Sequence, residues 1–278
     1  MRLGALSMMC REILLCQAYG EGGCVLIAAI VQARMSSSRL PGKVMREILG
    51  KPMIIHELER LKSCETLDKV ILATSVDESD TQLAEKVKDA GWEVYRGSLD
   101  DVLERYVQCA KAYGADHVVR ITGDCPVIDP EVVDCTVRVH LAHGNDYTSN
   151  GLGRATYPDG LDTEIMTAGA LAKADREARL ASEREHVTPY IVKHPELFKL
   201  EGIENDEDIS YERWTVDEPE DFEFVTRVYE DLYPKNPHFR MKDVQALLQN
   251  HPELRQINDG FERNEGFAKS LREDHIVK

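Results

Sequence analysis

Apolar and polar positions follow two different patterns over the first half of the chain. Continuous apolar runs predict buried strands at 25–31, 70–74 and 117–121, with a shorter strand at 93–96. Between these runs, apolar residues recur at helical spacing and predict helices at 52–62, 77–90, 99–113 and 130–140. Strands and helices that alternate across short loops favour an α/β fold with a mostly parallel sheet covered on both faces.

The alternation becomes looser after residue 144. Residues 145–158 are polar and contain glycines, so we predict a loop there. Further elements are predicted as helices at 167–180 and 218–229, a strand at 198–203, and short helices at 244–248 and 267–271. We interpret residues 25–278 as one domain, in which an inserted region at about 145–210 covers the active site.

Charge and cysteine content narrow the classes of function. The chain has 278 residues, 42% of them hydrophobic, and a formal net charge of -16. So acidic a protein is a poor match for nucleic acid, because phosphate contacts need a basic surface. The composition fits a cytoplasmic enzyme, and no apolar run approaches the ~20 residues of a membrane helix. The seven cysteines form no C-x-x-C pair, which favours reduced thiols over a zinc or redox site.

Residues 1–24 differ from the rest of the chain. They hold three cysteines and end in a glycine-rich patch at 20–23. A signal peptide is the alternative reading, but Arg11 and Glu12 interrupt its apolar core. We expect a disordered N-terminal extension.

The first predicted strand leads into a loop at 34–43 that carries three cations, Arg34, Arg39 and Lys43. Ligands of an open parallel sheet bind beyond the carboxyl ends of its strands. Cationic side chains gathered there can form charge-assisted hydrogen bonds with a polyphosphate. The loop is neither a Walker A nor a Rossmann glycine motif, and a charged surface turn is the alternative. We favour phosphate binding, because a turn needs no such cluster of cations.

Two aspartates lie at comparable positions further along the chain. Asp124 follows the strand at 117–121, and Asp217 ends a short apolar segment before a helix. Mg²⁺ takes few carboxylates, together with phosphate oxygens and water. Asp217 also fits a helix cap. With the cationic loop, the two carboxylates predict a magnesium–nucleotide site.

Two other motifs offer contacts to a second substrate. Asp159 and Asp162 suit a substrate hydroxyl or amine, although Pro-Asp-Gly is also an ordinary turn signal. Arg184 and His186 suit an acidic substrate, although the same stretch also fits a charged helix surface. The sequence has no G-x-S-x-G nucleophile motif.

Taken together, these motifs resemble those of the CMP-sugar-acid synthetase superfamily, which includes the acylneuraminate and 3-deoxy-manno-octulosonate cytidylyltransferases. The family pattern A-R-x-x-S-x-R-L-P-G-K appears at 33–43. Further matches are R-I-T-G-D-C-P at 120–126, R-E-H-V-T-P-Y at 184–190 and T-V-D-E-P-E-D at 215–221. The resemblance is closest to the branch of spore coat polysaccharide biosynthesis proteins and covers about residues 25–272.

The resemblance implies a three-layer, Rossmann-like nucleotidyltransferase fold of the nucleotide-diphospho-sugar transferase type. It also implies CTP as co-substrate, Mg²⁺ as cofactor and a homodimer. Catalytic positions would be Arg34, Lys43, Asp124 and Asp217, of which the two aspartates would hold the metal. Nucleotide-binding positions would be Ala33, Arg34, Ser37, Arg39 and Lys43 in the loop, with Ala73, Thr74, Arg96 and Gly97 near the base and ribose.

We therefore predict a cytidylyltransferase that transfers CMP from CTP to a sugar acid of the nonulosonic type for surface polysaccharide biosynthesis. An acceptor oxygen would attack the α-phosphorus directly, with release of pyrophosphate and no covalent enzyme intermediate. One alternative is a phosphonate acceptor. Another is a glycosyltransferase of related fold, but Asp159 and Asp162 have the wrong spacing for its D-x-D metal motif. A third is a nucleotide-binding regulator without catalysis. We expect small-molecule substrates, and neither nucleic acid nor a membrane as partner.

Overall fold

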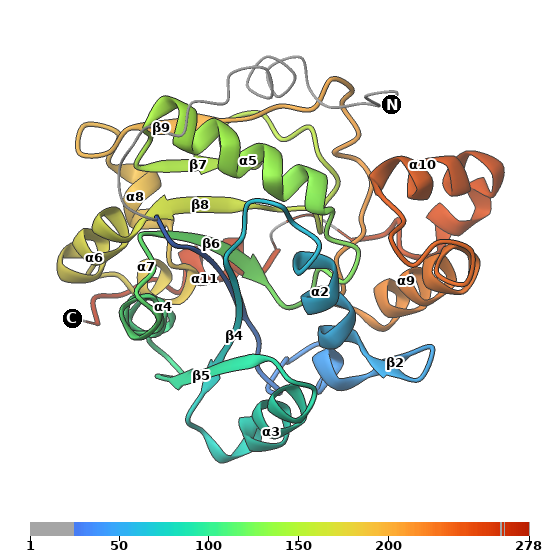
Figure 1. Ribbon diagram of the computed structural model, residues 1–278, viewed down its shortest axis with the longest axis horizontal. Coiled ribbons are helices and arrows are strands. Elements are labelled where there is room, and N and C mark those ends of the chain that lie inside the picture. The colour runs from blue at the N-terminus through green and yellow to red at the C-terminus, as the bar shows by residue number, and fades with distance from the viewer. Residues whose placement is uncertain (1–24, 262, 264, 278) are drawn as a thin grey trace.

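The centre of the protein is a seven-stranded sheet, seen in a computed structural model that describes residues 25–261, 263 and 265–277 (Figure 1). The strand order is β5-β4-β1-β6-β8-β7-β9. The strands are β1 (Ile27–Gln32), β4 (Lys69–Ser75), β5 (Glu93–Gly97), β6 (His117–Thr122), β7 (Tyr147–Ser149), β8 (Glu164–Thr167) and β9 (Leu200–Gly202). Of these described strands, β8 alone is antiparallel to its neighbours, so the prediction of a mostly parallel sheet is confirmed. The predicted extension at 1–24 lies outside the described residues.

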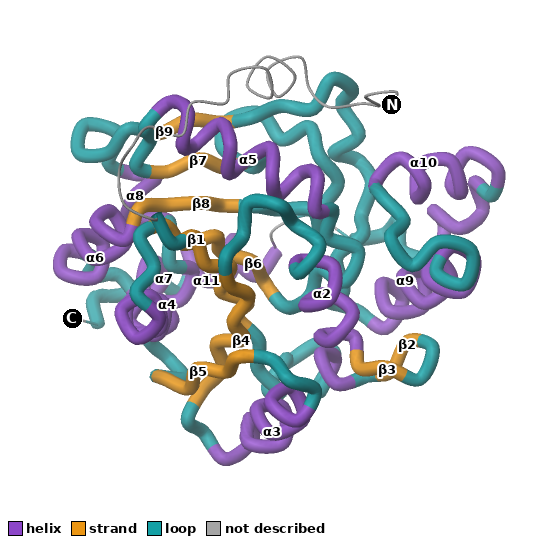
Figure 2. Tube along the Cα trace, viewed as in Figure 1, coloured by secondary structure: helices purple, strands orange, loops and turns teal. Residues whose placement is uncertain are grey.

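Helices cover both faces of this sheet and complete three layers (Figure 2). Successive residues of β1 point to opposite faces, as in any strand. Ala29 and Val31 share a core with α2 (Met53–Leu61), α3 (Thr81–Asp89) and α5 (Pro130–His143). Ala28 and Ile30 share the second core with α4 (Val102–Tyr113), α6 (Ala168–Glu177) and α8 (Pro189–Lys193). The predicted three-layer α/β architecture is therefore confirmed.

The remaining elements lie at the margins of the sheet. They are the hairpin of β2 (Glu47–Ile48) and β3 (Lys51–Pro52), and the helices α7 (Ala181–His186), α9 (Pro219–Leu232), α10 (Met241–Asn250) and α11 (Glu265–Arg272). The apolar faces of α9 and α10 join the same core as α2, and Figure 1 shows the two helices side by side at one end of the molecule. Within the described part of the chain, no helix has the length and apolar character to cross a bilayer.

The second half of the chain contributes more to the sheet than its sequence indicates. Residues 145–210, predicted as an inserted region, contain β7, β8 and β9, which extend the sheet beyond β6. The prediction of a loop over 145–158 is wrong at β7, and β8 was not predicted at all. The two strands have only three and four residues, too few to show a hydrophobic periodicity. The pairing of β7 with β8 and of β8 with β6 stabilises them.

Candidate active site

Three of the predicted site residues meet at one point beyond the carboxyl end of β1. Lys43 begins a short 3₁₀ turn (Lys43–Met45) and is only 8% exposed. Its Nζ donates to Asp124 Oδ2 at 3.1 Å, to Asp217 Oδ1 at 2.8 Å and to the carbonyl oxygen of Val216 at 2.7 Å. The cationic loop and the two distant aspartates, which the sequence separates by 81 and 174 positions, therefore converge on one ammonium group.

Close backbone packing brings Asp124 to this point. Gly123, just after β6, donates its N–H to the Gln32 carbonyl at the end of β1 at 2.8 Å. A Cβ atom on Gly123 would lie 2.8 Å from the Cβ of Ala33, so the two strand ends approach this closely because residue 123 is glycine. The carbonyl oxygen of Asp124 then accepts hydrogen bonds from the Val216 N–H at 2.8 Å and the Thr215 hydroxyl at 3.2 Å. These bonds join the Asp217 segment to the loop after β6.

Lys43 and Asp124 shift each other's pKa toward the charged forms. Burial alone would lower the pKa of Lys43, but the charges of Asp124 and Asp217 outweigh it and raise the pKa above its usual value. Burial alone would raise the pKa of Asp124, but the charge of Lys43 and hydrogen bonds from Thr122, Lys43 and Cys125 lower it. These opposite shifts favour the charged forms of Lys43 and Asp124 as a pair.

The other loop residues lie around this cluster. Arg39 bonds to Asp217 at 3.0 Å, to Glu218 at 3.2 Å and to Glu265 of α11 at 3.2 Å. Arg34 is half-exposed and lies 4.0 Å from Glu185. Ala33 is buried at the start of the loop, and Ser37 is partly exposed within it.

Asp80, which the sequence analysis missed, holds the loop in place. This fully buried carboxylate accepts the Met35 N–H at 2.7 Å and the Ser75 hydroxyl at 2.5 Å. It therefore joins the cationic loop to the end of β4. Asp80 lies in a stretch predicted as helix, and only its spacing from strand β4 could have singled it out.

The positions assigned to base and ribose lie at the ends of β4 and β5. Ala73 and Thr74 are fully buried, and the Thr74 hydroxyl has no hydrogen-bond partner among the described residues. Arg96 donates to the carbonyl oxygens of Ser75 and Asp77, both at 2.8 Å, and so supports the turn after β4. A Cβ atom on Gly97 would lie 3.0 Å from the Arg105 side chain, so backbone and side chain pack closely there.

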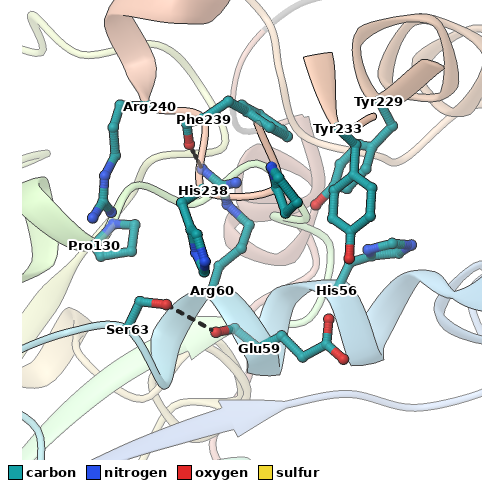
Figure 3. Close-up of a pocket in the computed structure, with 11 residues that line it drawn as sticks. His56, Glu59, Arg60, Ser63, Pro130, Tyr229, Tyr233, His238, Phe239 and Arg240 are labelled. Carbon is teal, nitrogen blue, oxygen red and sulfur yellow. Dashed lines mark hydrogen bonds between the residues drawn. The ribbon is translucent and has the colours of Figure 1, made fainter. Parts of the chain in front are cut away.

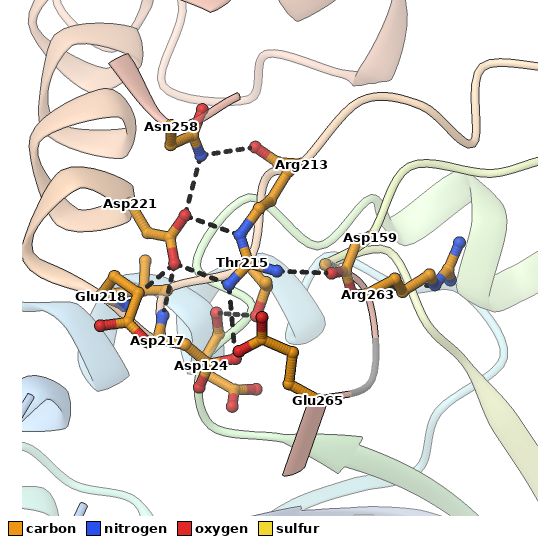
Figure 4. A network of polar contacts seen from close by, with 12 residues as sticks. Asp124, Asp159, Arg213, Thr215, Asp217, Glu218, Asp221, Asn258, Arg263 and Glu265 are labelled. Carbon is orange, nitrogen blue, oxygen red and sulfur yellow. Dashed lines mark hydrogen bonds and ion pairs between the residues drawn. The ribbon is translucent and has the colours of Figure 1, made fainter. Parts of the chain in front are cut away.

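Asp159 is linked to Asp217 through Arg213, which contacts both carboxylates in the network of Figure 4. Arg213 bonds to Asp159 at 3.0 Å, and Arg263 bonds to Asp162. Burial and the neighbouring Asp162 charge raise the pKa of Asp159 to about 7, although Arg263 and Arg213 act against the shift. Neither arginine was singled out in the sequence, because their partners are 54 and 101 positions away.

Arg184 and His186 have different surroundings. Arg184 is buried, with Nε 3.0 Å from Asp101 and further bonds to Asp175, so its donors are engaged within the chain. His186 contacts α11, through a 2.9 Å hydrogen bond with Ser270 and an edge contact with Phe267. Burial lowers the pKa of His186, although the Glu185 charge opposes the shift. Of the two residues, His186 therefore lies beside α11, whose Glu265 contacts Arg39 of the cationic loop.

A pocket of about 60 Å³ between α2 and α9 is separate from this site (Figure 3). Arg60 lies 4.3 Å over the Phe239 ring and donates to the Ile128 carbonyl at 2.7 Å, so its charge is satisfied by packing and backbone. None of the predicted site residues lines the pocket. We assign it no role.

Comparison with known sequences gives a consistent picture. The family model described as "Cytidylyltransferase" matches residues 28–259. An uncharacterised protein of Methanocaldococcus jannaschii is 35% identical over 89% of this chain and 98% of its own. The spore coat polysaccharide biosynthesis protein SpsF of Bacillus subtilis is 32% identical over 82% of this chain and 95% of its own. A 3-deoxy-manno-octulosonate cytidylyltransferase of Geobacter sulfurreducens is 36% identical, but the match spans only 42% of that protein.

Solved structures of two related enzymes have a similar fold. A cytidylyltransferase from Leptospira borgpetersenii superposes with a TM-score of 0.80 at 33% identity, over 86% of this chain and all of that one. A CMP:2-keto-3-deoxy-manno-octonic acid synthetase in complex with CTP has a TM-score of 0.56 at 18% identity, over 74% of this chain and 98% of that one. The second similarity is one of fold.

Proposed function

The chain belongs to the cytidylyltransferase family, and from this premise we propose that it transfers CMP from CTP to a sugar acid of the nonulosonic type in surface polysaccharide biosynthesis. The observation that carries the proposal is that the Asp124 and Asp217 carboxylates both lie within 3.1 Å of the Lys43 ammonium nitrogen. The names of the relatives, one for spore coat polysaccharide and one for 3-deoxy-manno-octulosonate, support a sugar-acid acceptor.

In the proposed reaction, an acceptor oxygen attacks the α-phosphorus of CTP. The new P–O bond forms as the bond to the β-phosphate breaks and pyrophosphate leaves, and the attacking hydroxyl releases its proton to solvent. Lys43, Arg34 and Arg39 would bind the β- and γ-phosphates, with Ser37 as a hydrogen-bond donor and Ala33 at the start of the loop. Their fixed positive charges would stabilise the leaving group. Ala73, Thr74, Arg96 and Gly97 would form the base and ribose end of the site.

The donor set of Asp124 and Asp217 fits Mg²⁺. Both are oxygen ligands that face the same ammonium, and the lowered pKa of Asp124 keeps it ionised. Within the described chain there is no group of three or more His, Cys, Asp and Glu side chains suited to a metal. Two carboxylates with substrate phosphates are nevertheless the usual Mg²⁺ environment in nucleotide enzymes. When bound there, the metal would neutralise charge on the phosphates.

For the acceptor, we propose Asp159 and Asp162 as partners of its hydroxyl groups and His186 as a contact at the edge of the site. Arg184 stays a weaker candidate, because Asp101 and Asp175 already occupy its donors. We also propose a homodimer and a cytoplasmic location, which light scattering and cell fractionation would test.

A pyrophosphate-release assay with purified protein tests the acceptor. CTP, UTP, ATP and GTP are each paired with a panel of nonulosonic acids, 3-deoxy-manno-octulosonate and simple phosphonates. Pyrophosphate release that needs both CTP and a sugar acid supports the proposal. Release only with phosphonates would replace it with the phosphonate alternative. In a parallel assay with nucleotide-sugars, sugar transfer without pyrophosphate release would replace it with a glycosyltransferase.

Asp217→Asn tests the metal assignment. The variant should lose at least ~100-fold in turnover, because a ligand charge is lost, while it still binds CTP weakly. Glu220→Gln is the matched control, since it removes one negative charge from the exposed first turn of α9, which begins two residues after Asp217. Full turnover of Asp217→Asn at saturating Mg²⁺ would contradict the role.

A further inference from the structure

Asp221 is the most completely hydrogen-bonded carboxylate of the network in Figure 4. It is fully buried in the first turn of α9. Its Oδ2 accepts the backbone N–H of Asp217 at 2.9 Å and that of Glu218 at 3.0 Å. These two bonds fix the backbone from which the Asp217 side chain projects.

The same carboxylate holds two side chains from outside the helix. Arg213 donates to it twice, through Nε to Oδ1 and through Nη2 to Oδ2, both at 2.8 Å. Asn258 donates to Oδ1 at 2.9 Å. A helix cap needs only the backbone bonds, so these contacts require another explanation.

Arg213 is also close to the predicted metal ligand. Its Nη2 lies 3.6 Å from Asp217 Oδ2, and its Nη1 lies 3.0 Å from Asp159 Oδ2. Bidentate pairing with Asp221 holds the guanidinium at this distance. Among the described residues, Asp217 is the other acid within 4.0 Å of Nη2, and a shorter ion pair would reduce the negative charge that Asp217 offers to a cation.

We propose that Asp221 is a positioning residue that keeps Asp217 available as a metal ligand, by fixing its backbone and by holding Arg213 away from its carboxylate. The inference rests on the proposed function, because it takes Asp217 as a Mg²⁺ ligand. Outer carboxylates that orient a ligand typically change metal affinity 10–100-fold when they are replaced.

Asp221→Asn in the full chain is the first test, with Mn²⁺ as the probe because it prefers the same oxygen ligands as Mg²⁺. Mn²⁺ binding, followed by electron paramagnetic resonance in the presence of CTP, should weaken about 10- to 100-fold. Asp243→Asn is the matched control. Asp243 occupies the same position in α10 and accepts the Arg240 N–H at 2.7 Å, but it contacts none of the site residues named above. The control should bind Mn²⁺ like the unmodified protein.

Arg213→Lys separates positioning from capping. The variant keeps the positive charge and leaves the backbone bonds of Asp221 intact, but a lysine cannot make the bidentate pair. Positioning predicts Mn²⁺ affinity at least ~5-fold weaker, and a cap alone predicts no change. If Asp221→Asn fails to fold, Arg213→Lys still tests the positioning role.

The two proposals can fail separately. If Asp217→Asn leaves Mn²⁺ affinity unchanged, the metal assignment of the proposed function is wrong. If Asp217→Asn abolishes Mn²⁺ binding, but Asp221→Asn and Arg213→Lys both match Asp243→Asn, only the positioning role is overturned.

Discussion

At the scale of single residues, Gly160 decides how closely the Asp159–Asp162 turn approaches the Asp217 segment. Its φ is +102°, and a Cβ atom there would lie 2.5 Å from the Thr215 nitrogen and 2.6 Å from the Trp214 carbonyl carbon. Two backbone hydrogen bonds of Asp159 hold these segments together. Its N–H donates to the Glu212 carbonyl at 3.0 Å, and its carbonyl accepts the Trp214 N–H at 2.7 Å. Any side chain at position 160 would have to separate the two backbones.

We predict that Gly160→Ala lowers the free energy of unfolding by about 2–4 kcal/mol, the sum of an unfavourable φ and a steric clash. Gly153→Ala is the control, because Gly153 also has a positive φ, +81°, but a Cβ atom there would have no atom of the described chain within 4 Å. It should lose only about 1 kcal/mol. Urea unfolding of both variants measures the difference. Equal losses of unfolding free energy would show that the close approach of the two backbones does not contribute to stability.

At the scale of elements, the parts predicted from sequence are those with a long and simple pattern. The strands β1, β4 and β6 are buried on both faces, so their apolar runs are continuous. Lys43 and Asp124 could be predicted as site residues because each follows such a strand, and Asp217 because it ends an apolar segment before a helix. The contacts of Asn258 with Asp221 and Arg213 span 37 and 45 positions between loops and a helix end, and no local pattern encodes them.

A histidine pair that joins α5 to β6, His140 and His117, should make stability depend on pH. His140 is fully buried, with Nδ1 3.1 Å from the Thr148 hydroxyl and Nε2 3.0 Å from His117 Nδ1. Burial, with the neighbouring His117, lowers the pKa of His140 to about 3. Between that value and the unfolded pKa of about 6.5, the unfolded chain binds the extra proton, so stability falls as the pH falls.

We predict that acidification from pH 6.5 to 4.5 lowers the free energy of unfolding by about 1 kcal/mol per pH unit through His140. His140→Gln should be less stable at pH 7.5 but have a flatter profile over this range. His251→Gln, at an exposed position, leaves the buried pair in place and should keep the steep profile. Denaturant unfolding at several pH values gives both slopes, and an unchanged slope in His140→Gln would contradict the assignment.

At the scale of the whole molecule, the C-terminal segment lies across elements that are far apart in sequence. Asn258 contacts Asp221, Arg263 donates to the Tyr157 carbonyl at 3.1 Å, and Glu265 bonds to Arg39 at 3.2 Å. Further along, the Ala181 N–H donates to the His275 carbonyl at 2.9 Å. The family match ends at residue 259, so most of this segment lies beyond it. The segment thus adds contacts of its own to a site built by the family domain.

The last prediction concerns Glu265, because its carboxylate pairs with Arg39, the cation that we propose binds the triphosphate. Arg39 is bound by Asp217, Glu218 and Glu265, and an incoming triphosphate must displace at least part of this set. Glu265 is the easiest to displace, since its side chain is 45% exposed and no residue of α11 is buried. An exposed ion pair contributes about 0.2–1 kcal/mol, so Glu265→Gln should tighten CTP binding by about 1.5- to 5-fold.

Calorimetric titration with CTP measures this gain, and added salt should reduce it, because salt screens the competing carboxylate. Glu273→Gln removes the same charge from the same segment, outside the set of acids that bind Arg39, and therefore controls for the general loss of negative charge. If both variants bind CTP equally, or Glu265→Gln binds it more weakly, the carboxylate does not compete with the nucleotide. A gain confined to Glu265→Gln would instead mean that each CTP molecule must displace a contact of the C-terminal helix before Arg39 can bind its phosphates.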